Sequence, residues 1–114
     1  MHFDLTKSEK KLARQIIEKG IQQDYVNGIV NVKEIIDGWN KDSSDHREVY
    51  HALYKTLTSH DKNIARKYDH LTGSKYILII MTQLAEGLIS KEDLEGFPDD
   101  LKERIISVTE GLGE

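Results

Sequence analysis

Apolar residues recur at spacings of three and four along most of this chain, which is the pattern of amphipathic α-helices. Thr6 and Glu9 form a capping-box pattern that opens a first predicted helix of about 20 residues, and Asn27-Gly28 interrupts it. A short second helix is expected over 31–40, because Asn31 can cap its first turn. The polar stretch 40–44 then predicts a loop.

The most regular pattern lies in 45–71, where Asp45 and Glu48 mark the start of a helix of about 26 residues. Gly73 suits the left-handed position that ends a helix, and Ser74 can cap the helix that follows. The apolar stripe of this long helix consists of Val49, Leu53, Leu57, His60, Ile64, Tyr68 and Leu71.

The run 76–81, with the sequence YILIIM, is the one stretch in which no polar residue separates the apolar ones. Good helix formers continue it to Gly87, so it predicts a fourth helix that is buried on all sides along its first half. Ser90 with Asp93 predicts a single capped turn, and Pro98 begins a last helix. The expected fold is all-α, a compact bundle of about five helices, in a single domain over residues 1–114.

Composition supports a soluble helical domain, since 38% of the 114 residues are hydrophobic and 32% are charged. The absence of cysteine excludes disulfides, thiolate metal sites and cysteine nucleophiles. The longest apolar run is far shorter than the roughly 20 residues that a membrane span needs, so no membrane contact is expected, and we expect a cytoplasmic location. No catalytic motif, cofactor site or metal site is predicted, and an enzyme is not expected.

Three aromatic residues, Trp39, Tyr50 and Tyr54, are predicted to gather where the second and third helices meet. Tryptophan and tyrosine are common anchors of protein interfaces. The apolar residues also have more faces to cover than about five helices can supply. The sequence therefore predicts contact with a protein partner, either a second copy in a homodimer or an unidentified protein.

A basic face offers an alternative. Lys62 and Arg66 each point within about 20° of Lys55 on the long helix, opposite its apolar stripe, and Lys67 and Lys75 lie nearby. Such a face could follow a phosphate backbone, which would make the protein a nucleic-acid-associated regulator. The net charge of −4 favours an ordinary solvated face instead.

His60-Asp61 resembles the adjacent His-Asp pair of a family of all-helical, metal-dependent phosphohydrolases. The resemblance covers two residues, and it implies an upstream histidine and a downstream aspartate as further metal ligands. His46 or His51 would serve upstream, and Asp93, Asp99 or Asp100 downstream. Because His60 lies on the apolar stripe, the sequence favours a histidine packed at the edge of the core.

The order of a short, a long and a short helix over 31–40, 45–71 and 74–86 is similar to the histone fold, and this resemblance implies an obligate dimer. No family is recognised over the whole chain.

Overall fold

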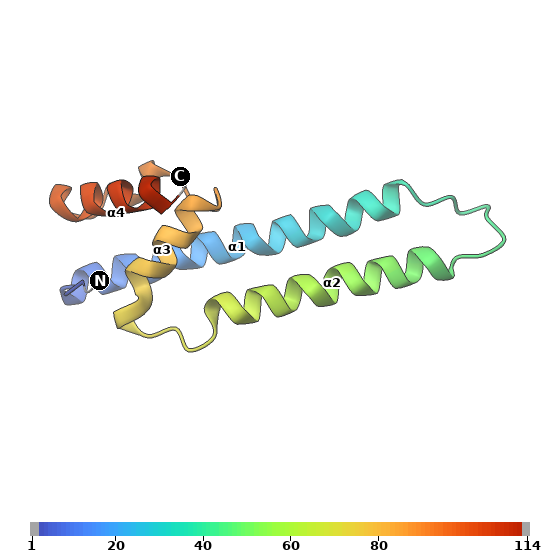
Figure 1. Ribbon diagram of the computed structural model, residues 1–114, viewed down its shortest axis with the longest axis horizontal. Coiled ribbons are helices and arrows are strands. Elements are labelled where there is room, and N and C mark those ends of the chain that lie inside the picture. Colours follow the sequence, from blue (N-terminus) through green and yellow to red (C-terminus); the bar gives the residue numbers. More distant parts are fainter. Residues whose placement is uncertain (1–2, 113–114) are drawn as a thin grey trace. The chain divides into compact units, whose positions relative to one another are not determined.

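The structure is a computed structural model, and it describes residues 3–112 (Figure 1). This part of the chain contains four α-helices and no β-strand, so the all-α class is confirmed and the expected five helices are wrong. The α-helices are α1 (Lys7–Asp37), α2 (Arg47–Tyr68), α3 (Tyr76–Ala85) and α4 (Asp99–Leu112), and the single turns of 3-10 helix are η1 (Gly73–Lys75) and η2 (Lys91–Leu94).

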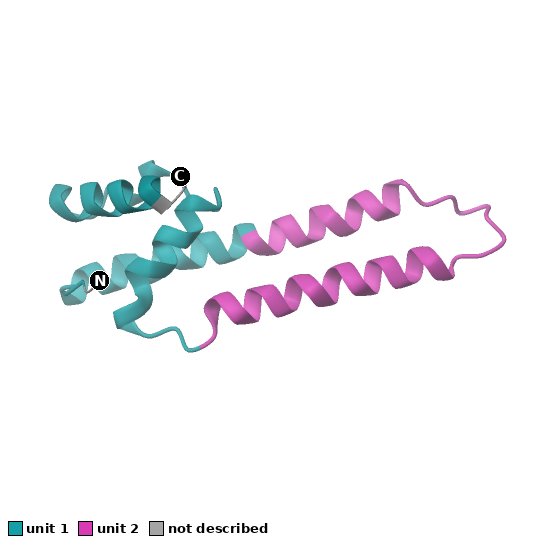
Figure 2. Ribbon diagram, viewed as in Figure 1, with its two compact units in different colours: residues 1–23, 70–114 teal, residues 24–69 magenta. Residues whose placement is uncertain are grey.

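The contacts gather into two units, not into one bundle (Figure 2). One unit comprises residues 1–23 and 70–114, and the other comprises residues 24–69. Helix α1 contributes to both units, since the division falls between Gln23 and Asp24. The single domain over 1–114 stays a prediction.

Helix α1 is one continuous helix of 31 residues, so the predicted break at Asn27-Gly28 is wrong. Gly28 is buried, and a Cβ atom there would lie 2.4 Å from Cδ2 of His60. The glycine therefore allows the His60 ring to approach the helix, and it does not mark a turn. With no separate helix over 31–40, the order of helices that suggested a histone fold is also absent from the described residues.

Capping signals give correct helix boundaries at Thr6 and Ser90. The predicted starts at Asp45 and Ser74 are wrong, since α2 begins after His46 and α3 begins after Lys75, each without a side-chain cap. The Thr6 backbone N–H donates to Oε1 of Glu9 at 2.8 Å, and the Glu9 N–H donates to Oγ1 of Thr6 at 3.1 Å. Ser90 and Asp93 form the same reciprocal pair before η2. Gly87, two residues after the end of α3, has a φ of 75°, which is the left-handed conformation that ends a helix, as predicted.

Helix α2 is shorter than the predicted helix over 45–71, with 22 residues. It ends because Asp69 is extended and His70 takes a left-handed conformation with a φ of 60°. Gly73, which was predicted to take that conformation, lies in η1 instead.

The unit formed by residues 1–23 and 70–114 contains most of the hydrophobic core. Ile77 and Ile80 of α3 are buried, but Leu78 is 46% exposed, so the prediction that the first half of α3 has no solvent face is wrong. The side chain of Gln83 is buried and donates to the backbone carbonyl of Ile17 at 3.0 Å. The buried hydrophobic residues of this unit are Ala13, Ile16, Ile17, Tyr76, Ile77, Ile80, Met81, Leu88, Ile89, Leu94, Phe97 and Ile105.

Residues 24–69 form a helical hairpin, in which the second half of α1 runs antiparallel to α2 and the loop 38–46 joins them (Figure 2). The structure describes all of these residues, and Ile64 is the only buried hydrophobic residue among them. The hairpin thus lacks a hydrophobic core of its own, although apolar residues recur along both of its helices.

Candidate functional site

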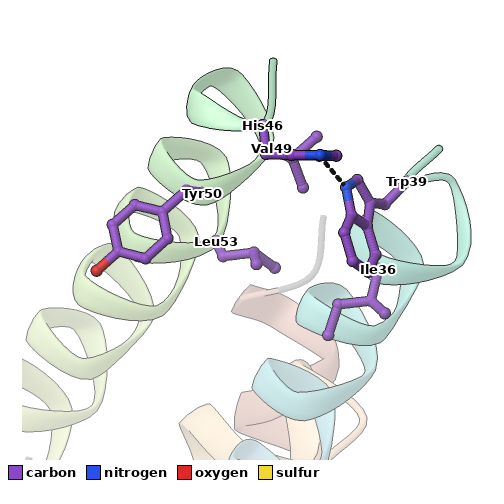
Figure 3. Close-up of a pocket in the computed structure, with 6 residues that line it drawn as sticks. All are labelled: Ile36, Trp39, His46, Val49, Tyr50 and Leu53. Atoms are coloured by element: carbon purple, nitrogen blue, oxygen red, sulfur yellow. Dashed lines mark hydrogen bonds between the residues drawn. The ribbon is translucent and has the colours of Figure 1, made fainter. Parts of the chain in front are cut away.

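A pocket of about 270 Å³ lies at the tip of the hairpin (Figure 3). Nε1 of Trp39 donates a hydrogen bond of 2.9 Å to Nδ1 of His46, and the two rings meet edge to face with centroids 5.6 Å apart. An indole N–H can only donate, so Nδ1 of His46 is the unprotonated ring nitrogen. This tip pocket is lined by Ile36, Trp39, His46, Val49, Tyr50 and Leu53.

A second pocket, of about 130 Å³, lies between the same helices nearer the middle of the hairpin. We call it the middle pocket. Its lining is also mainly apolar, although His60 and the carboxylate of Asp61 contribute to it. The lining residues are Tyr25, Gly28, Ile29, Leu57, His60, Asp61 and Ile64.

The two pockets belong to one side of the hairpin. With 100° per residue, Tyr25, Ile29 and Ile36 of α1 point within about 40° of one another, and Tyr50, Leu53 and Leu57 of α2 point within about 60° of one another. Together these side chains form a surface that we call the apolar face. It consists of Tyr25, Ile29 and Ile36 from α1 and of Tyr50, Leu53 and Leu57 from α2.

Most of the apolar face is open to solvent. Ile29 is 65% exposed, Tyr50 69% and Leu57 56%, and Tyr25 and Ile36 are nearly half exposed. An exposed apolar surface of this size is often a contact site.

The opposite side of the hairpin is polar. The residues that point about half a turn away from the apolar face are Asn27, Asn31 and Glu34 on α1 and Glu48, Lys55, Ser59, Lys62 and Arg66 on α2. All of them are exposed. The hairpin as a whole is therefore amphipathic, with one apolar and one polar side.

A buried polar cluster closes the base of the hairpin. Asp24 is 3% exposed, and its carboxylate accepts hydrogen bonds from Nζ of Lys67 at 3.1 Å and from the hydroxyl of Tyr68 at 2.5 Å. Nε2 of His60 donates to the backbone carbonyl of Asp24 at 2.8 Å. Because a carboxylate is buried together with its cation and donors, the cluster fixes the pairing of the two helices.

The three predicted aromatic anchors lie in the hairpin, but not in one cluster. Trp39 and Tyr50 line the tip pocket, whereas Tyr54 is 68% exposed and lies outside it, at the margin of the apolar face. Ile29 and Leu57, which are also exposed in the apolar face, were not among the predicted site residues. Helical spacing placed Leu57 in an apolar stripe, whereas the expected break at Asn27-Gly28 left Ile29 outside any predicted stripe.

The predicted basic residues are separated by the fold. Lys55, Lys62 and Arg66 share an exposed side of α2, as predicted. Lys67 instead pairs with Asp24 and is largely buried, with 16% of its side chain exposed. Lys75 lies in η1, in the other unit.

His60 is part of the contact between α1 and α2, where its ring bonds to the backbone of Asp24 and packs against Gly28. Nε2 of His60 is bound to a backbone carbonyl, and Nδ1 of His46 accepts from Trp39. Within residues 3–112, no three histidine, aspartate or glutamate side chains gather in a group that could hold a metal ion. The ligand set implied by the resemblance to phosphohydrolases is therefore not assembled in the described residues.

Comparisons with family models, with curated proteins and with solved structures found no match to this chain. Among the described helices, none combines the length and the apolar character that crossing a membrane requires.

Proposed function

We propose that this protein is a non-enzymatic helical module that acts through protein contacts, and that the apolar face of residues 24–69 is its contact surface. The observation that supports this most directly is that the hairpin buries one hydrophobic residue, Ile64, while five of the six residues of the apolar face are exposed. Stable helical folds bury the apolar stripe of each helix against other elements, and most helical stability comes from that packing. Two helices alone leave part of each stripe uncovered.

The shape of the apolar face supports the same proposal. Large side chains are exposed beside two pockets. Interface hot spots are commonly large side chains of one protein that enter a pocket on the other. The tip pocket has Trp39 in its wall, held by the hydrogen bond to His46. A pre-formed wall lowers the entropic cost of association, because fewer side chains must be ordered on binding.

Photo-crosslinking in the cells in which the protein naturally occurs would test this proposal. A photoreactive amino acid at Leu57 should give covalent adducts with protein. The same residue at Ser59, two positions away on the polar side of α2, should give few. Equal yields from the two positions would contradict the proposal, because the two sides of the hairpin would then meet proteins equally often.

A second candidate function is association with nucleic acid through Lys55, Lys62 and Arg66. It is supported by the exposure of all three on one side of α2. Three phosphate contacts would make the logarithm of the affinity fall with the logarithm of the salt concentration with a slope of about −2.7. A mobility-shift series at low salt should then show retardation that is lost when all three residues become glutamate, and the absence of any retardation would exclude this function.

A further inference from the structure

We infer that the partner of the apolar face is a second copy of this chain, so that two hairpins pack face to face as four helices. This inference rests on the proposed function, since it names the partner of the same surface. Three observations support a second copy over an unrelated protein. They are the area of the apolar face, its lack of charge, and the apolar side chains that the hairpin leaves uncovered beside the seam between α1 and α2.

The exposed area of the apolar face approaches the lower limit for a specific protein interface. At about 200 Å² for a fully exposed side chain of this size, the five exposed residues of the apolar face leave about 570 Å² open on each copy. Two copies would bury about 1,100 Å² from these side chains alone, close to the lower limit of about 1,200 Å² for specific interfaces. Trp39 and Tyr54, at 42% and 68% exposure, lie beside the face and would raise the buried area further.

The chemistry of the face also fits a second copy. None of its six residues is charged, and Asp61 is the only carboxylate that lines either pocket. A strongly basic or acidic partner would therefore find almost nothing to pair with, whereas a neutral apolar surface is complementary to another of the same kind. In a symmetric pair, the same patch serves both molecules, and one association covers both exposed faces.

The internal packing of the hairpin leaves room for this arrangement. Its inner seam includes the contact of Gly28 with His60 and the Asp24 cluster, beside the buried Ile64, so polar contacts contribute to the pairing of α1 with α2. The large apolar side chains lie at the flank of that seam. In four-helix packing, protruding residues such as Ile29 and Leu57 would enter the pockets of the facing hairpin, which is the knobs-into-holes geometry of helical bundles.

Sedimentation equilibrium of the purified full chain tests the inference with two charge variants and one control. Leu57→Glu and Ile29→Glu place a carboxylate in the apolar face from α2 and from α1. Ser59→Glu makes the same change of charge on the polar side of α2. Because Leu57, Ile29 and Ser59 are all exposed, each variant should fold, and circular dichroism would verify the helix content.

We expect the unsubstituted protein to sediment as a dimer. Each face variant should weaken dimerisation at least about 100-fold, because the symmetric interface buries the new charge twice. Ser59→Glu should change the dissociation constant less than about threefold.

A labelling experiment provides an independent measurement, since the chain has no cysteine. The thiol of Leu57→Cys should react more slowly as the protein concentration rises through the dimerisation range. The thiol of Ser59→Cys should react at a constant rate.

A chain that remains monomeric at about 100 μM overturns the inference, and so does a dimer that both face variants leave intact. The outcome for the proposed function is separate. A monomeric chain whose Leu57 position crosslinks to a different protein in cells would retain the contact surface and exclude the second copy. Equal crosslinking from Leu57 and Ser59 would exclude the contact surface itself.

Discussion

Replacing Gly28 by alanine tests the close approach of α2 to α1. An alanine in the middle of a helix normally stabilises a protein by about 0.5–1 kcal/mol relative to glycine, since glycine loses more backbone entropy on folding. At this position the sign should reverse. The new Cβ would lie 2.4 Å from Cδ2, 2.6 Å from Nε2 and 3.0 Å from Cγ of His60, and the first two distances are too short for any real contact.

The expected loss of stability comes from displacement of the His60 ring. Its ring is held between Gly28 and the backbone carbonyl of Asp24, to which Nε2 donates at 2.8 Å. Overfilling a packed site costs about 1–3 kcal/mol, and a displaced ring would also lose a hydrogen bond of about 1 kcal/mol. Against the gain in helix propensity, the net destabilisation by Gly28→Ala should be about 1–3 kcal/mol.

Trp39 provides a suitable assay, because it is the only tryptophan in the chain and it lies in the hairpin. Its fluorescence during urea unfolding reports on residues 24–69. All variants are measured at the same protein concentration, so that any self-association contributes equally to each. A double-mutant cycle isolates the contact. In a His60→Ala background the ring is absent, and Gly28→Ala should become stabilising by about 0.5–1 kcal/mol.

Gly111→Ala in α4 serves as a reference, since a Cβ there meets nothing within 4 Å. Because Gly111 lies outside residues 24–69, the unfolding of this variant is followed by circular dichroism. It should be neutral or slightly stabilising. If Gly28→Ala stabilises the hairpin with His60 present, the packing of the ring against α1 is wrong, and so is the explanation for the continuous helix.

Two further changes test the polar contacts. Asp24→Asn removes the carboxylate that pairs with the largely buried Lys67, so it should destabilise the hairpin by about 2–4 kcal/mol in urea unfolding. Asp37→Asn, in an exposed ion pair, should change stability by less than about 0.5 kcal/mol. Equal effects would contradict the burial of the Asp24 pair. The hydrogen bond from Lys19, followed by that from the backbone N–H of Ser90, lowers the pKa of Asp93 below its ordinary value of 3.8. The unfolded chain therefore binds this proton at higher pH than the folded chain does, so the stabilisation is complete above the unfolded pKa and is lost as the pH falls through the folded pKa. Asp93→Asn should consequently reduce stability at neutral pH, and this deficit should shrink as the pH falls below the ordinary pKa of 3.8, as a series of urea midpoints would show. A deficit that does not shrink in acid would exclude this origin.

Helix ends could be predicted from the sequence where the determining contacts are local. Thr6 with Glu9, and Ser90 with Asp93, are three residues apart, and each pair forms the reciprocal bonds that its pattern predicts. Gly87 likewise needs no distant partner to end a helical segment. Such contacts depend on the chain within one turn, so the residue types are sufficient to predict them.

The continuity of α1 could not be predicted in this way. Asn27-Gly28 is a turn signal by residue type, but the reason for the glycine is His60, which lies 32 positions further along the chain. The same limit applies to Lys67, whose charge suggested a basic surface until the fold brought Asp24 beside it. In both cases a contact between distant residues outweighs the local preference.

Helical periodicity identified the apolar residues of the hairpin, but not what covers them. Leu57 was assigned to a core stripe together with Ile64, and the structure leaves Leu57 56% exposed while Ile64 is buried. The spacing of the two is compatible with either result, because periodicity gives the direction of a side chain and not the presence of a neighbour. Whether a stripe is core or surface depends on a partner helix that the sequence of one chain does not show.

The hairpin separates two properties that most helical packing combines in the same residues. Its pairing includes, besides the buried Ile64, groups that tolerate little variation: a glycine with no room for a Cβ, a histidine bound to a carbonyl, and a buried ion pair. Polar contacts of this kind fix geometry but add little net free energy, because their desolvation offsets much of what they gain. The hydrophobic free energy is instead available on the open flank, in Tyr25, Ile29, Tyr50 and Leu57. A surface whose shape is already set by the seam, and whose apolar area is not yet used, has the properties expected of a pre-organised interface.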